Sequence, residues 1–198
     1  MSIRGLFFDL GGTLFSYSGD IGREGVMHAV EALAIDAEPP DIGQAWRAAS
    51  QEAAAEYAAK SYFLHSELFR ATLDRFAARF DRETSDALAE SFHARQREAV
   101  VANLPIRDDC HSTLQSLKDR GLYLSIVSNI DDDYLDPLVA MHGLDDVLHD
   151  WTSSEEARSC KPDRGIFHYA LRKSGLSVDE VLFVGDSLHH DEIGRAHV

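Results

Sequence analysis

The sequence predicts an α/β fold, a doubly wound parallel sheet with an inserted all-helical segment. Short apolar runs at residues 3–8, 122–127 and 181–184 each end in Gly, Asp, Ser or Asn, a texture typical of parallel strands buried on both faces. A helical pattern that closes on a glycine precedes each of the two later runs, at 111–120 and 165–174. Helix and strand in this repeated order indicate a Rossmann-like core.

The region between the first two strand-like runs is Ala-rich and helical. Four amphipathic helices in this region could bury one another's apolar stripes. We therefore expect a Rossmann-like core of residues 1–15 and 105–198, and a four-helix cap of residues 16–104. The expected helices lie near 20–35, 41–61, 62–80 and 83–103.

The composition is that of a folded protein with an acidic surface. Of 198 residues, 44% are hydrophobic, and 34 acidic residues outnumber 19 basic ones, for a formal net charge of −15. Such a charge repels nucleic-acid phosphates and anionic lipids, so we expect neither nucleic acid nor membrane as a partner. No apolar run reaches the roughly 18 residues of a membrane span.

The cellular location follows from the start of the chain and from its cysteines. The first strand-like run begins directly after Met1, so there is no room for a signal peptide. Cys110 and Cys160 lack CxxC or zinc-binding spacing, which favours reduced thiols. We predict a cytoplasmic protein.

Acidic residues follow the first and last strand-like runs. Asp9 ends the first run and is followed by Gly11 and Gly12, whereas Asp186 and Asp191 follow the last run. Ligands bind at the carboxyl ends of parallel strands, and neighbouring strands lie ~4.8 Å apart. Carboxylates at that spacing repel unless a cation lies between them, and Mg²⁺ prefers oxygen ligands. The glycines let the backbone turn and approach a ligand closely.

The middle run and a later lysine add phosphate-binding groups. Ser128 and Asn129 offer a hydroxyl and an amide, and Lys161, followed by Pro162, offers a cation. A carboxylate nucleophile, a metal, a hydroxyl and a lysine together are typical of phosphoryl transfer.

With these motifs in this order, the sequence resembles the haloacid dehalogenase-like hydrolase superfamily, in the subfamily with an inserted helical cap. The resemblance spans residues 9 to 191 and implies a Mg²⁺-dependent hydrolase of a small phosphorylated metabolite that forms an aspartyl-phosphate. The motifs are Asp9-Leu10-Gly11-Gly12-Thr13, Ser128-Asn129, Lys161-Pro162-Asp163 with Gly165-Ile166-Phe167, and Gly185-Asp186-Ser187 with Asp191.

By this resemblance, Asp9 is the expected nucleophile and Lys161 neutralises nucleophile and phosphate. Asp191 is expected to be a metal ligand or to hold one, and Gly11 would contribute its backbone carbonyl. The expected phosphate-binding residues are Gly12, Thr13, Ser128, Asn129 and Lys161, and the expected metal site comprises Asp9, Gly11, Asp186 and Asp191.

The sequence departs from the family at Gly11, where phosphatases carry an aspartate that acts as general acid and base. Such a group contributes about 10²- to 10⁴-fold in rate. Another residue could supply the proton, the substrate could have a good leaving group such as an acyl phosphate, or the protein could bind phosphate or Mg²⁺ with little turnover. The candidate substitutes are Asp20, Glu24 and His28 in the cap and His189 and His190 in the core.

Carbon–halogen or carbon–phosphorus hydrolysis is a further alternative, because branches of the family without that aspartate catalyse these reactions. The phosphonate branch uses a cap lysine, and the cap has only Lys60, which we interpret as a solvated charge. We interpret the acidic run 131–133 as a helix N-cap. After Asp191 such proteins usually complete a helix and add an outer strand, so we expect an uncovered sheet edge that leads to dimerisation or instability.

Overall fold

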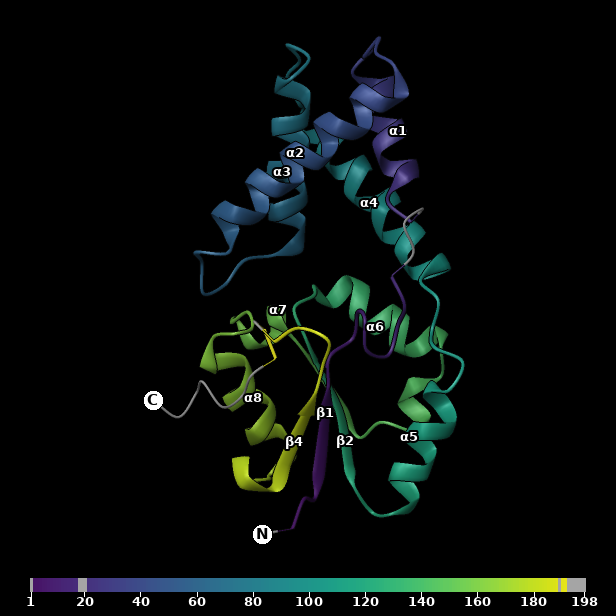
Figure 1. Cartoon of the computed structure of the whole chain (residues 1–198), viewed down its shortest axis with the longest axis vertical. Helices are drawn as coiled ribbons and strands as arrows, with labels where there is room; N and C mark the ends of the chain where they lie inside the picture. Colours follow the sequence, from purple (N-terminus) through teal and green to yellow (C-terminus); the bar gives the residue numbers. More distant parts are fainter. Residues whose placement is uncertain (1, 18–20, 189, 192–198) are drawn as a thin grey trace. The chain divides into compact units, whose positions relative to one another are not determined.

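The chain folds into two compact units in a computed structural model that describes residues 2–17, 21–188 and 190–191. One unit comprises Met1–Ser18 and Leu104–Val198, and the other comprises Gly19–Asn103. The second unit is therefore inserted into the sequence of the first. Figure 1 shows the strands in the first unit and the helices α1 to α4 in the second.

The first unit contains a parallel four-stranded sheet of order β3-β2-β1-β4. This sheet confirms the predicted α/β fold class. All four residues of β1 are buried, as are the last five of β2, because helices cover both faces of the central strands. The strands are β1 (Gly5–Phe8), β2 (Tyr123–Ser128), β3 (Asp150–Ser153) and β4 (Val181–Val184).

The strand β3 is absent from the sequence prediction, because its four residues are largely polar. Thr152 and Ser153 are nevertheless buried. Ser153 uses its hydroxyl to accept a hydrogen bond from Glu156 N at 2.8 Å, which caps the short helix α7 (Ser154–Ala157). Polar side chains here serve the turn at the end of the strand, so the hydrophobic pattern of a buried strand is missing.

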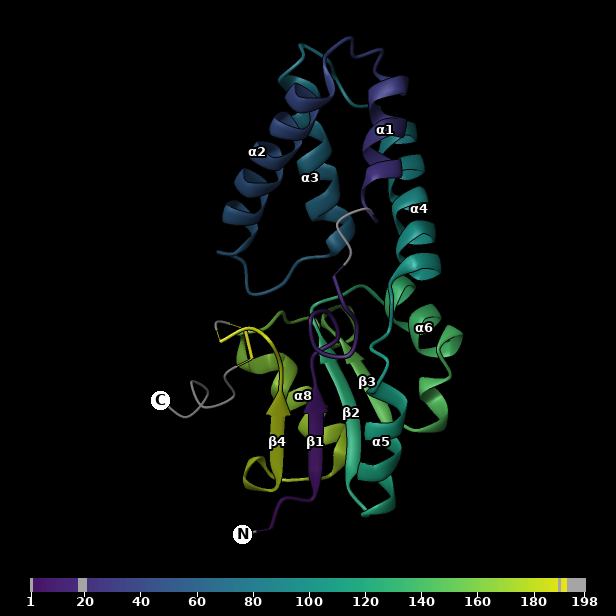
Figure 2. The same ribbon diagram turned by 45° about the vertical axis from the view of Figure 1, so that its right-hand side comes forward.

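Helices pack on both sides of this sheet, with α5 in front of it and α8 behind it in Figure 2. Ile166, Phe167 and Ala170 of α8 form one core cluster with Phe7 and Val127. The helix α8 ends at Gly175, whose φ of +68° suits glycine. The helices of this unit are α5 (Cys110–Asp119), α6 (Asp132–Met141), α7 and α8 (Arg164–Ser174), with short 3₁₀ turns at Leu144–Asp146 and Val178–Glu180.

The strand β4 forms one edge of the sheet. Among the described residues it pairs with β1 alone, and the side chains of Leu182 and Val184 are exposed. An exposed edge of this kind offers unpaired backbone groups to another chain. The expected dimerisation stays a prediction.

The helical unit is built from α1 (Arg23–Ala32), α2 (Pro39–Tyr57), α3 (His65–Ala78) and α4 (Asp86–Asn103). The helix α2 begins at Pro39, two residues before the expected start at 41, because proline fits the first turn of a helix. Trp46 packs edge-on against Phe76 with ring centroids 5.3 Å apart, inside the core of this unit. Gly25 lets α1 approach α4 closely, since a Cβ there would lie 2.6 Å from Gln96 Oε1.

The two connections between the units run antiparallel to each other within the first unit. Ser16 N donates to Pro105 O at 2.9 Å and Arg107 N donates to Leu14 O at 3.0 Å. An antiparallel bridge pairs Phe15 with Ile106. The chain therefore leaves the first unit and returns to it at adjacent points.

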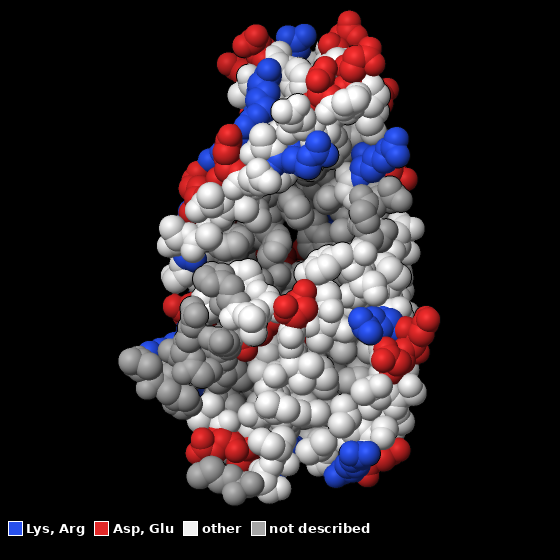
Figure 3. Space-filling view, in the orientation of Figure 1, with Lys and Arg blue, Asp and Glu red and all other residues white. Residues whose placement is uncertain are grey.

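Two features concern the expected absence of nucleic-acid and membrane partners, which stays a prediction. Acidic and basic side chains are interspersed in small groups on the face drawn in Figure 3. Within the described part of the chain, each helix is too short or too polar to cross a membrane.

Both cysteines are free and buried, which confirms the prediction of reduced thiols. Burial, together with the nearby Asp109 carboxylate, raises the pKa of the Cys110 thiol to about 11. We expect neither Cys110 nor Cys160 to react with a disulfide reagent in the folded protein at pH 8, because both thiols are buried and the raised pKa of Cys110 makes its reactive thiolate scarce. Both should react after unfolding. Fast reaction before unfolding, or no free thiol after it, would contradict this expectation.

Candidate active site

Asp9 directly follows β1 and is 8% exposed. Its backbone N–H donates to Val184 O at 2.9 Å, which extends the pairing of the two strands. The carboxylate oxygen Oδ1 accepts a hydrogen bond from Lys161 Nζ at 2.6 Å and another from Ser128 Oγ at 3.0 Å. Two donors from different elements therefore fix the plane of the Asp9 carboxylate.

Lys161 is buried and held by its backbone. Asn129 donates from Nδ2 to Lys161 O at 2.9 Å and accepts from Lys161 N at its Oδ1 at 2.6 Å. Asn129 thus positions Lys161, a role that its place beside Ser128 did not reveal. The predicted contact of Asn129 with phosphate stays a prediction, and the structure gives the amide another partner.

The start of α8 anchors the same segment. Asp163 accepts hydrogen bonds at Oδ1 from Gly165 N and from Ser159 Oγ, both at 2.8 Å. A Cβ on Gly165 would lie 2.6 Å from Ser159 Oγ, so the tight turn needs glycine there. The N-cap Asp163 and Gly165 thus hold the segment of Lys161 at the carboxyl ends of the strands.

Asp186 and Asp191 follow β4 and lie close to Asp9 at the carboxyl ends of the strands. Carboxylate oxygens from the three residues all lie within 4.8 Å of one another. Asp191 accepts from Lys161 Nζ at 2.6 Å through Oδ1 and from Ser187 N at 3.0 Å through Oδ2. Hydrogen bonds from Lys161 and from its own loop therefore hold the Asp191 carboxylate beside the other two.

Glycines make this close approach possible. Gly12 has a φ of +78°, and a Cβ there would overlap the carboxylate of Asp186. In the same way a Cβ on Gly185 would overlap the carboxylate of Asp191. The backbone of each loop therefore lies directly beside a carboxylate, as only glycine permits.

Thr13 lies in the same loop as Gly11 and Gly12. Its hydroxyl oxygen is buried and has no hydrogen-bond partner among the described residues. A buried polar group without a partner is costly, and a ligand oxygen would remove that cost.

Tyr17 is the site residue that sequence reasoning missed. A Cβ built on Gly11 would lie 3.0 Å from the Tyr17 hydroxyl. Partial burial and the carboxylates of Asp186 and Asp9 raise the pKa of Tyr17 above its ordinary value. The phenol is therefore protonated at neutral pH. An aromatic residue shortly after the glycine loop was the only available signal.

The proposed substitutes for the missing aspartate are placed as follows. Asp20 and His189 lie outside the described residues. Glu24 and His28 belong to α1 of the helical unit, where His28 Nε2 is 3.0 Å from Ser91 Oγ. His190 Nδ1 is 3.1 Å from Ser187 Oγ in the loop after β4.

Lys60 follows α2 in the helical unit and contacts its own neighbours. Its Nζ lies 3.4 Å from the centre of the Tyr57 ring and 4.0 Å from Glu56 Oε1. These contacts agree with the interpretation of Lys60 as a surface charge.

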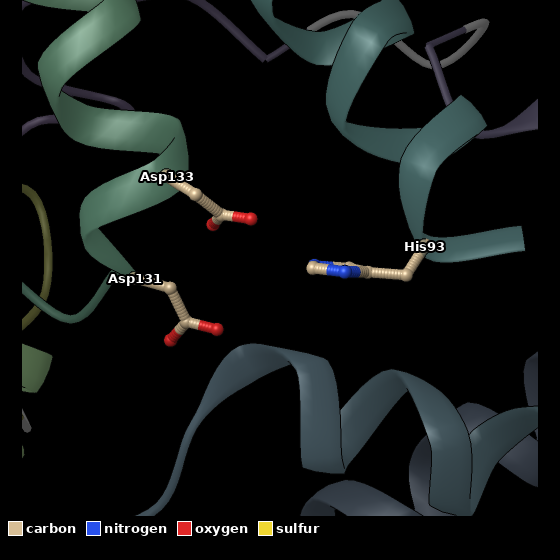
Figure 4. A group of neighbouring side chains, drawn as sticks. All are labelled: His93, Asp131 and Asp133. Atoms are coloured by element: carbon tan, nitrogen blue, oxygen red, sulfur yellow. The ribbon is translucent and has the colours of Figure 1, made fainter. Parts of the chain in front are cut away.

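The acidic run 131–133 stands at the start of α6, as Figure 4 shows for Asp131 and Asp133; His93, also drawn there, belongs to α4. Asp131 is the N-cap residue, but its side chain makes no capping hydrogen bond. Glu155 instead accepts from Asp132 N at 2.8 Å. The run therefore stands at the helix N-terminus as predicted, with Asp132 and Asp133 in the first turn, but Asp131 does not cap the helix through its side chain.

Residues 3–197 match the family model of the haloacid dehalogenase-like hydrolases. The chain belongs to this family. The match confirms the resemblance that the four motifs indicated, and it makes the protein a member of a family of hydrolases.

Curated relatives include phosphatases and dehalogenases. A phosphoglycolate phosphatase from Haemophilus influenzae is 32% identical over 85 residues, which is 43% of this chain and 37% of the phosphatase. An (S)-2-haloacid dehalogenase 4A from Burkholderia cepacia is 26% identical over 196 residues, which is 94% of this chain and 76% of the dehalogenase. The chain thus aligns with less than two fifths of the first relative's length.

Solved structures share the fold. The HAD-hydrolase YfnB from Bacillus subtilis, bound to magnesium, has a TM-score of 0.76 at 18% identity, covering 96% of this chain and 83% of that one. A predicted phosphoglycolate phosphatase from Haemophilus somnus has a TM-score of 0.69 at 20% identity, covering 95% and 79%. At these identities the likeness concerns the fold alone.

We expect Lys161→Met to lower the free energy of unfolding by about 3–5 kcal/mol, because two buried carboxylates lose their cation. Lys173→Met is the matched control, since Lys173 bonds Asp150 and Glu156, each at 2.9 Å, in a more exposed ion pair. Lys173→Met should lower the free energy of unfolding by about 1 kcal/mol or less. Urea unfolding in the presence of a chelator measures both, and equal losses would contradict the special role of Lys161.

Proposed function

We propose that the protein hydrolyses a small phosphorylated metabolite with Mg²⁺ and that Asp9 carries the phosphoryl group between two steps. One observation carries this proposal, namely the convergence of Asp9, Asp186 and Asp191 within 4.8 Å, with Lys161 bonded to two of them. Three carboxylates face one ammonium group there. The surplus negative charge suits a divalent cation and a bound phosphate together.

The residues fit a magnesium ion. Mg²⁺ takes oxygen ligands at ~2.1 Å, so ligands on opposite sides of it lie ~4.2 Å apart, close to the observed grouping. Asp9, Asp186 and the Gly11 carbonyl would hold the ion, with Asp191 and Lys161 beside it. When bound, the ion would offset repulsion between the Asp9 carboxylate and the phosphate.

The chain's own residues account for the remaining chemistry. Lys161 and Ser128 hold Asp9 Oδ1, so we assign the attack on phosphorus to Oδ2, the oxygen that neither donor holds. The bond between phosphorus and the leaving oxygen breaks as the Oδ2–phosphorus bond forms. Water then attacks phosphorus, phosphate departs and the carboxylate is restored. Lys161 compensates negative charge throughout.

The phosphate group would lie against the loop that follows β1. The Thr13 hydroxyl has no hydrogen-bond partner in the described part of the chain, and Ser128 stands at the end of the neighbouring strand β2. Relatives named phosphoglycolate phosphatase make a small phosphorylated carboxylic acid the first substrate to try. Gly11 limits proton transfer, which favours substrates with good leaving groups.

Carbon–halogen hydrolysis is the second candidate, and Gly11 is the observation that favours it. Halide departs without a proton, so an acid at position 11 is not needed. The (S)-2-haloacid dehalogenases also align with 93–94% of this chain. The cluster of three carboxylates argues for the phosphatase, because a haloacid is itself an anion and brings no need for a divalent cation.

We expect Asp9→Asn to abolish turnover, with a loss of at least about 10³-fold, because the amide cannot attack phosphorus. The measurement is phosphate release with Mg²⁺ from 2-phosphoglycolate, acetyl phosphate, sugar phosphates and 4-nitrophenyl phosphate. Asp136→Asn is the matched control, since Asp136 is exposed on α6 and accepts a hydrogen bond from Trp151 Nε1. It should keep wild-type activity.

Three results would count against the proposal. Activity of the Asp9→Asn protein equal to that of the wild type would reject the mechanism. Release of halide from (S)-2-chloropropionate without release of phosphate would favour the second candidate. A wild type that binds phosphate but turns over none of these compounds would be a binding protein.

We expect Gly12→Ala to reduce activity by at least about 10-fold, because its methyl group displaces the Asp186 carboxylate. Gly121→Ala is the matched control, since Gly121 has nearly the same φ, +77°, with nothing within 4 Å. Both variants should lose about 1–2 kcal/mol of unfolding free energy from the left-handed backbone. Full activity in Gly12→Ala would show that the close approach is dispensable.

A further inference from the structure

Tyr17 occupies the space beside position 11. A Cβ on Gly11 would lie 3.0 Å from the Tyr17 hydroxyl oxygen, 3.2 Å from Cε1 and 3.3 Å from Cζ. A Cβ on Gly12 would lie 2.9 Å from Tyr17 Cε2. The tyrosine ring therefore lies across both glycines, in the place that a side chain at position 11 would need.

The surroundings of Tyr17 connect it to the carboxylate cluster. Gly12, which the ring contacts, lies directly beside Asp186, since a Cβ there would overlap Asp186 Oδ2. Tyr17 is nevertheless 75% exposed, so a ligand can reach it from solvent. The result is a hydroxyl that lies beside the glycine loop after the nucleophile and is accessible to a ligand.

We propose that Tyr17 is a catalytic residue whose hydroxyl donates a hydrogen bond to the substrate oxygen that leaves phosphorus when Asp9 attacks. This role rests on the proposed phosphoryl transfer to Asp9. The leaving oxygen takes the electron pair of the broken bond to phosphorus, and Tyr17 keeps its proton. The leaving group gains its proton, where it needs one, from water after departure.

This role defines a substrate class. A hydrogen bond stabilises negative charge on the leaving oxygen but does not remove it, whereas a carboxylic acid at position 11 would transfer a proton. The site therefore suits phosphates whose leaving group departs as a stable anion, such as acyl phosphates. Alkyl phosphates depend most on the hydroxyl, since their leaving oxygen carries the most concentrated charge.

The test compares Tyr17→Phe with the wild type on acetyl phosphate, 4-nitrophenyl phosphate and glycerol phosphate. We expect kcat for glycerol phosphate to fall about 10-fold or more and kcat for acetyl phosphate to change by less than about 2-fold. Rate should thus depend more steeply on leaving-group pKa in the variant. Tyr169→Phe is the matched control, because that hydroxyl donates to Glu156 on α7 and should leave all rates unchanged.

The outcomes separate this role from the proposed function. Turnover in the wild type that depends on Asp9 and is unaltered by Tyr17→Phe would overturn the role of Tyr17 alone. An equal loss on every substrate would also overturn it, because a structural defect has no leaving-group dependence. A wild type without turnover that depends on Asp9 would overturn both.

A second pair of variants tests whether Tyr17 and position 11 compete for one place. In the Tyr17→Ala protein the added Gly11→Asp has room for its carboxyl group. We expect this double variant to turn over glycerol phosphate about 100-fold faster than Tyr17→Ala alone. Gly11→Asp alone meets the Tyr17 ring, so its gain should be smaller. Equal gains from Gly11→Asp in the wild type and in Tyr17→Ala would show that Tyr17 does not occupy the place of a side chain at position 11. That result would overturn the proposal, which rests on this placement.

Discussion

The ion pair that joins Lys161 to Asp9 and Asp191 is the constraint on which the candidate site depends. All three residues are nearly inaccessible to solvent along their side chains. Removing these charges from water is expensive, so the attraction between them mainly offsets the cost of burial. Such a cluster is better explained by chemistry at the site than by stability.

Separate parts of the chain must come together for this pair to form. The strand β1 presents Asp9, Asn129 fixes the backbone of Lys161, and the loop after β4 supplies Asp191. The positive charge that a phosphate needs is therefore local. The net charge of −15 describes the whole chain, so it does not exclude a small anion from this site.

Sequence reasoning succeeded where a residue's position follows from its place at the end of a strand. The approach of Asp9 to Asp186 was predicted because both follow apolar runs that form neighbouring parallel strands. The strand β3 was not predicted, because polar residues that serve a helix cap hide its pattern. The place of Tyr17 was not predicted, because it depends on the turn at Gly12. Asn129 was predicted to be a site residue, but its bonds to the backbone of Lys161 were not, because they depend on the path of a distant loop.

The paired connections that lead into and out of the helical unit bear on how the protein folds. Gly5 pairs with Tyr123 across the whole inserted segment, and closing so long a loop is entropically unfavourable. The first and last helices of the insert pack against each other where Gly25 meets Gln96. Once these helices associate, the ends of the insert are close together, and the remaining search for β1 and β2 resembles that of a much shorter chain.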